Sequence, residues 1–307
     1  MTQLIGWRSV FYINVPIGAL ALWIGWHFIP NDGVRKPKER FDPIGAGTFM
    51  VGLTALLLGL NQGSTWGWGS LPTLFSLAAA GLILLVFIWH ENRTGAPMLD
   101  LKLFRSWNFS LASLSAVFNY ICVYSVIFLL PFFLIQGRGL NPAQAGLLLT
   151  AQPIVMAVVA PISGTLSDRI GTRLPSVLGM LGLSLGIFLL SRLDGSSSLT
   201  QVVLSLLVVG FGTGTFISPN NSALMGSAPR SRQGIAAGVL ATARNFGMVL
   251  GVGISGAIFT TVVARAQAPG SSEALFQAVQ ASFLVAAGLG LLGVVTSFGR
   301  SPNVESE

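Results

Sequence analysis

The sequence predicts an all-α polytopic membrane protein with about nine transmembrane helices. Hydrophobic residues make up 52% of its 307 residues and charged residues only 9%, against about 25% charged residues in soluble domains. Apolar runs recur along the chain at lengths that cross about 30 Å of hydrocarbon, which takes about 20 helical residues. Glycine, at 37 residues, is abundant, as expected where helices approach closely in lipid.

Nine such runs follow one another, separated by short connections that hold most of the charges. The second is short and the fourth and eighth are long, so the number of helices is better defined than their ends. The expected helices span residues 9–29, 43–60, 71–90, 107–135, 143–165, 174–191, 199–219, 236–264 and 277–298.

Lysine and arginine are distributed unequally between the two sets of alternate loops, and this bias predicts the orientation. Basic residues are enriched in cytoplasmic loops. The richer set places the C-terminus in the cytoplasm and the N-terminus of the chain outside, in a cell membrane. The formal net charge of +7 is therefore a topology signal and does not indicate nucleic-acid binding. The richer set contains Arg35, Lys36, Lys38, Arg40, Arg93, Lys102, Arg105, Arg169, Arg173, Arg230, Arg232 and Arg300, and the poorer set Arg8, Arg138, Arg192 and Arg265.

The connection between the fifth and sixth runs, residues 164–173, packs three charges between apolar segments. We expect Gly164 to end one helix and Asp168 to stand at the start of the next, where the helix dipole favours an acid. A charged turn between two membrane helices would explain these residues without a special role. The stretch also resembles the signature loop of the major facilitator superfamily, G-x-L-x-D-R-x-G-R-R. The matching residues are Gly164, Leu166, Asp168, Arg169, Gly171 and Arg173, and Thr172 departs from the pattern. The resemblance implies a cytoplasmic loop that helps to latch the inner gate.

Further segments resemble the fourteen-helix drug:proton antiporter branch of that superfamily. They are residues 6–18, 41–45, 97–101, 130–147 and 218–238. Their order implies that residues 1–106 hold the last helix of a first half and two linker helices. Residues 107–300 would form a C-terminal six-helix bundle, and residues 301–307 a cytoplasmic tail. It also implies that about five helices of the family's first half, the missing N-terminal half, are not represented before Met1.

No acidic residue falls in the middle of an apolar run, and this limits the chemistry that the chain can perform. Proton coupling usually needs an intramembrane carboxylate. If protons are the coupling ion, as the resemblance implies, the carboxylates should lie outside these residues. We interpret His27 and His90, near predicted cytoplasmic helix ends, as interfacial side chains in preference to proton carriers. The single Cys122 excludes an internal disulfide. We expect no catalytic residues, no metal site and no cofactor.

Polar residues inside the apolar runs are the candidates for a substrate path, because polar groups facing lipid are costly. For Asn119 and Gln152, hydrogen bonding between helices is an equal alternative, and for Asn220 a structural helix end is preferred. Arg244 either faces a cavity or extends its side chain to the membrane surface. The candidates are Asn119, Tyr124, Gln152, Asn220, Arg244 and Asn245. Glycines at Gly234, Gly238, Gly247 and Gly251 predict close helix packing.

The residues and the resemblance together predict membrane transport, with the lipid bilayer and a small-molecule substrate as partners. The expected activity is export of small amphipathic drugs or metabolites by alternating access, as part of a larger transporter. The alternative is a truncated non-transporting remnant or an accessory membrane subunit. An enzyme is not expected, since no nucleophile with a base, metal cluster or phosphate loop is present.

Overall fold

The computed structural model describes residue 12, residues 14–28 and residues 42–301, except residues 68, 96, 98, 100, 267, 269 and 270. The chain divides into two compact units, Met1–Phe41 and Asp42–Glu307. In the first unit, helix α3 (Asn14–Phe28) covers most of the first expected membrane helix. The remainder of that expected helix lies outside the described residues.

The second unit contains eight segments that are long and apolar enough to cross a membrane, counted over the described residues. The described residues hold no strand, so the predicted all-α polytopic fold is confirmed. Two 3₁₀-helices, η1 (Leu101–Arg105) and η3 (Arg230–Arg232), precede α6 and α11. The spans are formed by α4 (Pro43–Trp66), α5 (Leu71–Glu91), α6 (Trp107–Pro131) with the π-helix η2 (Phe132–Gly137), α7 (Pro142–Leu149) with α8 (Ala151–Ile170), α9 (Arg173–Leu190), α10 (Leu199–Gly226), α11 (Gln233–Arg265) and α12 (Ser272–Phe298).

Two of the expected helices are interrupted, and proline gives the physical reason in each case. Proline has no backbone N–H and its ring crowds the carbonyl one turn earlier. Pro131 ends α6, and the backbone continues as the wider π-helix η2. Pro153 cannot donate to the carbonyl of Leu149, where α7 ends. The backbone forms a tighter turn at this point, in which the Thr150 N–H donates to the Leu147 carbonyl, three residues earlier, at 3.2 Å.

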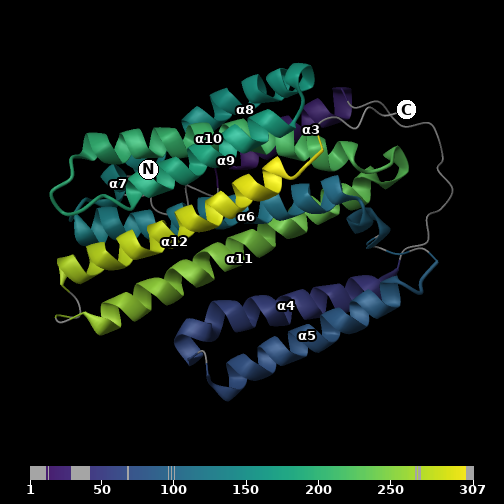
Figure 1. The fold of residues 1–307 in the computed structure, drawn as a ribbon, viewed down its shortest axis with the longest axis horizontal. Helices are drawn as coiled ribbons and strands as arrows, with labels where there is room; N and C mark the ends of the chain where they lie inside the picture. Colours follow the sequence, from purple (N-terminus) through teal and green to yellow (C-terminus); the bar gives the residue numbers. More distant parts are fainter. Residues whose placement is uncertain are drawn as a thin grey trace. The chain divides into compact units, whose positions relative to one another are not determined.

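The helices from α6 onward form a bundle with a continuous apolar core. Helix α10 packs against α8 and α9, α11 packs against α6, and α12 packs against both α6 and α9 (Figure 1). Cys122, Leu183, Phe216 and Phe283 are among the fully buried core side chains. The only cysteine of the chain therefore lies inside the bundle.

Glycines allow α9 and α10 to approach closely. A Cβ added at Gly179 would lie 2.5 Å from the Phe216 nitrogen, and one at Gly186 would lie 2.6 Å from the Val209 nitrogen. A Cβ added at Gly212 would overlap the backbone of Leu183. Lipid provides no hydrophobic driving force between membrane helices, so their association depends on close van der Waals packing, which small residues allow.

Helices α4 and α5 form an antiparallel pair, and α4 also contacts α11. Asp42 caps α4 by accepting from the Gly45 N–H at 2.8 Å, and His90 Nε2 lies 3.1 Å from its other oxygen. The Gly45 N–H first, and then His90, hold the pKa of Asp42 below its ordinary value against the opposing effect of burial. The compact unit that contains the bundle begins at Asp42 and includes α4 and α5. The domain boundary expected at residue 106 stays a prediction.

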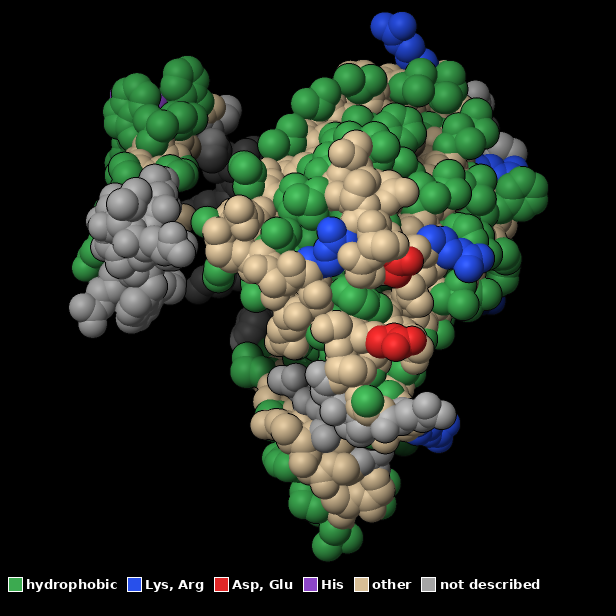
Figure 2. Space-filling model, turned by 90° about the vertical axis from the view of Figure 1, so that its left-hand side faces the viewer, with side chains coloured by type: hydrophobic (Ala, Val, Ile, Leu, Met, Phe, Trp, Pro, Cys, Tyr) green, Lys and Arg blue, Asp and Glu red, His purple; other side chains and the backbone are tan. Residues whose placement is uncertain are grey.

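Apolar side chains cover most of the visible surface. Figure 2 shows a face on which hydrophobic side chains predominate and only a few charged side chains interrupt them. Leu147, Ile154, Leu185 and Val295 are exposed large apolar residues of α7, α8, α9 and α12. Such surface is typical of a protein whose solvent is lipid.

Candidate functional site

A polar pocket of about 580 Å³ opens among α6, α10 and α11. Its lining residues are Tyr120, Tyr124, Asn221, Met225, Ala237, Leu240, Ala241, Arg244, Asn245 and Met248. Arg244 is the only charged side chain among these lining residues. A cation, two phenols and two amides therefore meet within an otherwise apolar set of helices.

Helical periodicity explains why these residues share one space. Tyr120 and Tyr124 are four residues apart on α6, and residues three and four apart lie on the same face of a helix. On α11, Ala237, Ala241 and Arg244 follow the same spacing. The pocket is thus built by one face of each helix.

Close packing beside the pocket holds α6 and α11 in place. A Cβ added at Gly247 would lie 2.6 Å from Tyr120 Cβ and 2.8 Å from the Val117 carbonyl oxygen. One added at Gly251 would lie 2.5 Å from the Ile121 carbonyl oxygen. Only glycine permits these contacts, so the two glycines set the position of the Tyr120 side chain relative to α11.

The Arg244 side chain is exposed on α11 and interacts with the phenol of Tyr124. Arg244 lies 11 residues beyond the start of α11, which corresponds to about 16 Å along the helix. A guanidinium offers five N–H donors in a planar fork and stacks on aromatic rings. The pocket can therefore hold a planar or anionic group.

Three of the predicted path residues lie elsewhere. Asn119 is fully buried on the other side of α6, where its Nδ2 contacts Met180 Sδ at 3.6 Å. Gln152 is buried on α8, where its backbone lies against Gly210 of α10. Only Tyr124, Arg244 and Asn245 of the predicted set line the polar pocket.

Asn220 is the third, and the structure corrects the expectation that it lies at a helix end. Helix α10 continues to Gly226, so Asn220 is inside the helix and fully buried. Its Nδ2 donates to the Ala112 carbonyl at 3.2 Å, and its Oδ1 accepts from Arg300 Nη1 at 3.1 Å. Asn220 therefore ties α10 to α6 and to the end of α12.

The burial of Arg300 could not be predicted from the sequence, because Arg300 stands two residues beyond the last apolar run. Its side chain is 3% exposed, and its Nη2 has no hydrogen-bond partner in the described structure. Burial first, and then the charge of Arg173, lower the pKa of Arg300 to about 10. Arg173 itself stacks over the Phe298 ring at 4.4 Å.

The signature loop differs from its expected geometry in two ways. Gly164 does not end a helix, because α8 continues to Ile170, and a Cβ there would lie 2.6 Å from Ser218 Oγ on α10. Asp168 lies in the last turn of α8, and the next helix starts at Arg173. The expected stabilisation of Asp168 by a helix N-terminus is therefore wrong, since the C-terminal end of a helix is its negative end.

Gly171 supplies the turn between α8 and α9. Its φ of +85° is a conformation that favours glycine. Asp168 and Arg169 are both exposed. Over the part of the chain that the structure describes, the only ion pair joins His90 and Asp42. The role of this loop as a gate stays a prediction.

Among the described residues, no group of three or more His, Cys, Asp or Glu side chains is arranged to hold a metal ion. His90 pairs with Asp42 at the ends of the α4 and α5 pair, and the His27 ring lies 5.1 Å from the Trp23 ring in α3. The polar pocket is the cavity lined by a guanidinium, two phenols and two amides.

Comparison with known proteins identifies the family of this chain. The family profile of the Major Facilitator Superfamily matches residues 112–307. The chain is 31% identical over 275 residues to multidrug resistance protein Stp of Mycobacterium tuberculosis, covering 90% of this chain and 51% of that protein.

Two further relatives carry substrate names. Riboflavin transporter RibZ of Clostridioides difficile is 31% identical over 292 residues, which are 94% of this chain and 62% of that protein. The tetracenomycin C resistance and export protein of Streptomyces glaucescens is 30% identical over 263 residues, 86% of this chain and 49% of that protein. The chain spans about half the length of the curated relatives it matches.

Proposed function

Because this chain belongs to the Major Facilitator Superfamily of membrane transporters, we propose that it forms the substrate-binding part of an exporter of small amphipathic drugs or metabolites. The polar pocket of Tyr124, Arg244 and Asn245 carries this proposal. The relatives' names support the substrate class, since they include drug resistance, riboflavin transport and tetracenomycin C export.

The charge of the pocket narrows the class of substrate. Arg244 is not balanced by a carboxylate among the residues that line the pocket. The Arg244 charge would repel a cationic drug, whereas an anionic or neutral aromatic compound could accept hydrogen bonds from the guanidinium and stack on Tyr120 and Tyr124. We therefore expect aromatic substrates that are neutral or carry an acidic group.

Alternating access would expose this pocket to each side of the membrane in turn. In such transporters the substrate lies near the midplane, between two structural repeats that rock against each other. The chain would supply one wall through α6, α10 and α11. The remaining length of the relatives would supply the other wall.

We also propose that export is coupled to protons, because the sequence resembles the drug:proton antiporter branch of the superfamily. In the described spans, carboxylates lie at helix ends: Glu91 ends α5, Asp168 lies in the last turn of α8 and Glu273 in the first turn of α12. A coupling carboxylate at mid-membrane depth would therefore come from another part of the transporter. Arg244 could respond to it electrostatically across the pocket.

Ligand binding to the full 307-residue chain in lipid nanodiscs tests the proposal. The probes are fluorescein, an anionic aromatic compound, and ethidium, a cationic one. We expect fluorescein to bind and Arg244→Ala to raise its Kd at least about tenfold, equivalent to about 1.4 kcal/mol. Arg244→Lys should give an intermediate Kd, because it keeps the charge and loses the planar fork.

Arg265→Ala is the matched control, since Arg265 is an exposed arginine in the last turn of the same helix. It should leave the fluorescein Kd unchanged. Equal binding of both probes, or unchanged binding by Arg244→Ala, would contradict the assigned pocket. A folded chain that binds neither probe would favour the alternative, a non-transporting membrane subunit.

A further inference from the structure

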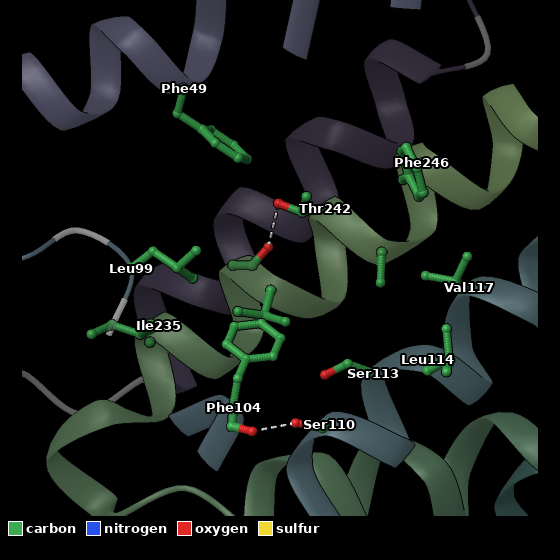
Figure 3. Close-up of a pocket in the computed structure, with 14 residues that line it drawn as sticks. Phe49, Leu99, Phe104, Ser110, Ser113, Leu114, Val117, Ile235, Thr242 and Phe246 are labelled. Atoms are coloured by element: carbon green, nitrogen blue, oxygen red, sulfur yellow. Dashed lines mark hydrogen bonds between the residues drawn. The ribbon is translucent and has the colours of Figure 1, made fainter. Parts of the chain in front are cut away.

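A second, apolar cavity of about 650 Å³ lies between α6 and α11, apart from the polar pocket (Figure 3). Leu114 and Val117 of α6 line one wall, and Phe246 of α11 lines the opposite one. Phe49 of α4 and Phe104 of η1 complete the enclosure.

The hydroxyl groups in this cavity are already paired with backbone carbonyls. Ser110 Oγ donates to the Phe104 carbonyl at 2.5 Å, Ser113 Oγ to Phe109 at 2.8 Å and Thr242 Oγ1 to Gly238 at 2.9 Å. Figure 3 draws two of these bonds as dashed lines, one from Ser110 to the Phe104 carbonyl and one from Thr242 to the Gly238 carbonyl. The cavity therefore offers apolar surface to an occupant and almost no free polar group.

Two glycines form part of the wall and make no close contact with a neighbouring helix. A Cβ added at Gly234 or Gly238 would meet nothing within 4 Å. The close packing expected at these two positions is not found, unlike at Gly247 and Gly251. The missing side chains leave space that a ligand can fill.

The cavity follows the helix axis over the depth of one lipid leaflet. Its α11 lining runs from Gly234 to Phe246, and 12 residues of α-helix rise about 18 Å. Half of a hydrocarbon core of about 30 Å is about 15 Å. A long apolar slot of this depth matches a lipid acyl chain more closely than a compact drug.

The two short helices next to one end of this slot carry basic residues. The short helix η1 supplies Phe104 to the wall and also carries Lys102 and Arg105. The short helix η3 directly precedes Gly234 and carries Arg230 and Arg232. Arg105 and Arg230 are both exposed. Basic pockets at the cytoplasmic ends of transmembrane helices favour anionic lipid headgroups.

The wall at this end is also held by hydrogen bonding and ring packing. The buried Glu91 carboxylate accepts from the Leu99 N–H at 3.2 Å, and Leu99 lines the cavity. The Phe104 ring packs edge-on against Phe109 at 5.2 Å. The side chains that line this end of the slot are thus positioned without a ligand.

We propose that this cavity binds an anionic phospholipid of the cytoplasmic leaflet. One acyl chain would lie along Gly234 and Gly238, and the headgroup would lie beside Arg105 and Arg230. The site is separate from the polar pocket proposed for substrate. The choice of leaflet rests on the orientation that the loop charges predict.

Native mass spectrometry of the delipidated full chain tests this site. The probes are phosphatidylglycerol and phosphatidylcholine with identical oleoyl chains. We expect phosphatidylglycerol to be retained at least fivefold more than phosphatidylcholine. Gly238→Phe should abolish most of that retention, because its ring enters the slot, where a Cβ meets no atom. The double variant Arg105→Ala with Arg230→Ala should remove the preference for phosphatidylglycerol.

Matched variants separate this site from general lipid adhesion. Gly288 lines a groove of about 630 Å³ between α9 and α12, and a Cβ there also meets nothing within 4 Å. Gly288→Phe should therefore leave phosphatidylglycerol retention unchanged. The double variant Arg192→Ala with Arg265→Ala removes two charges elsewhere and should keep the lipid preference.

Four outcomes would overturn the proposal. Equal retention of both lipids by the wild-type chain would exclude an anionic site. Equal losses in Gly238→Phe and Gly288→Phe would indicate general adhesion. A lower melting temperature of Gly238→Phe with unchanged lipid retention would show that protein fills the slot. If Gly238→Phe instead weakened fluorescein binding and left lipid retention intact, the slot would belong to the substrate path and the lipid site would be rejected.

Discussion

Replacing Gly212 by alanine tests the close packing of α9 against α10. The added Cβ would lie 2.6 Å from the Gly182 carbonyl carbon and 2.7 Å from the Leu183 Cα, and it would overlap the Leu183 nitrogen. Carbon atoms in contact normally lie about 3.5 to 4.0 Å apart. The atoms that must yield are backbone atoms, so the two helices have to separate by roughly 1 Å.

The expected loss follows from two opposing effects. Forcing an extra methyl group into a packed core costs about 1 to 3 kcal/mol. Alanine favours the helix over glycine by about 0.5 to 1 kcal/mol. Separation also loosens the contacts that Gly179 and Gly186 make with the same helix. We expect a net destabilisation of about 2 kcal/mol, which is a factor of about 30 in the unfolding equilibrium.

The single cysteine provides the assay. Cys122 is fully buried in the core, so a thiol-reactive fluorophore labels it only when the bundle opens. Thermal unfolding in detergent, followed by this labelling, should show a Tm several degrees lower for Gly212→Ala than for wild type. Heat alone unfolds the protein in this assay, and no cysteine has to be introduced.

Gly238→Ala is the control, because glycine is replaced in a helix where a Cβ meets nothing. It should leave the Tm unchanged or raise it through helix propensity alone. A wild-type Tm for Gly212→Ala would refute the packing argument. A Tm loss in Gly238→Ala equal to that in Gly212→Ala would show that any glycine replacement is harmful and would refute it as well.

Three further predictions concern the charged groups and the topology. Asn220→Ala should destabilise the bundle by about 1.5 to 3 kcal/mol, because it removes the side-chain acceptor of a hydrogen bond from the buried Arg300 guanidinium. Thermal unfolding measures this loss. Asp168→Asn should leave the Tm unchanged or slightly raised, since it removes a negative charge from a helix C-terminus, yet it should lower transport in a complete transporter if the loop acts as a gate. Cysteines introduced at Gly69 and Gly226 should react with an impermeant maleimide from opposite sides of the membrane, Gly69 from outside.

Each of these predictions has a result that contradicts it. Asn221→Ala is the control for Asn220→Ala, because Asn221 is partly exposed at the pocket and should change stability by no more than about 0.5 kcal/mol. Equal effects of the two asparagine variants would exclude the Arg300 contact as the cause. Unchanged transport by Asp168→Asn at normal abundance would exclude the gating role. Labelling of both introduced cysteines from one side would exclude the predicted topology.

The fold class and most of the helices could be predicted from the amino-acid sequence. Apolar runs of about 20 residues have one common solution in lipid, a helix that satisfies its own backbone hydrogen bonds. The positions of α4, α5, α9 and α12 therefore follow closely from hydropathy alone. The signature loop and its neighbouring motifs also indicated the family, because they are local patterns read in order.

The ends and breaks of the helices were harder to predict from the sequence, because hydropathy marks only the part of a helix that lies in hydrocarbon. Helix α8 continues through Asp168, and α10 continues through Asn220 to Gly226. Backbone hydrogen bonding does not stop where the side chains become polar. For this reason Asp168 lies at the end of α8, whereas the sequence had predicted it at the start of the next helix.

Which polar residues share a site depends on how the helices pack, and this became visible in the three-dimensional structure. Tyr124, Arg244 and Asn245 lie on faces that point into one pocket, whereas Asn119 and Asn220 lie on faces that pack against other helices. Helical periodicity gives the face of each residue on its own helix, but the rotation of each helix against its neighbours depends on packing over its whole length. The burial of Arg300, the overlap at Gly212 and the open space at Gly238 all depend on those rotations, so a single sequence could not reveal them.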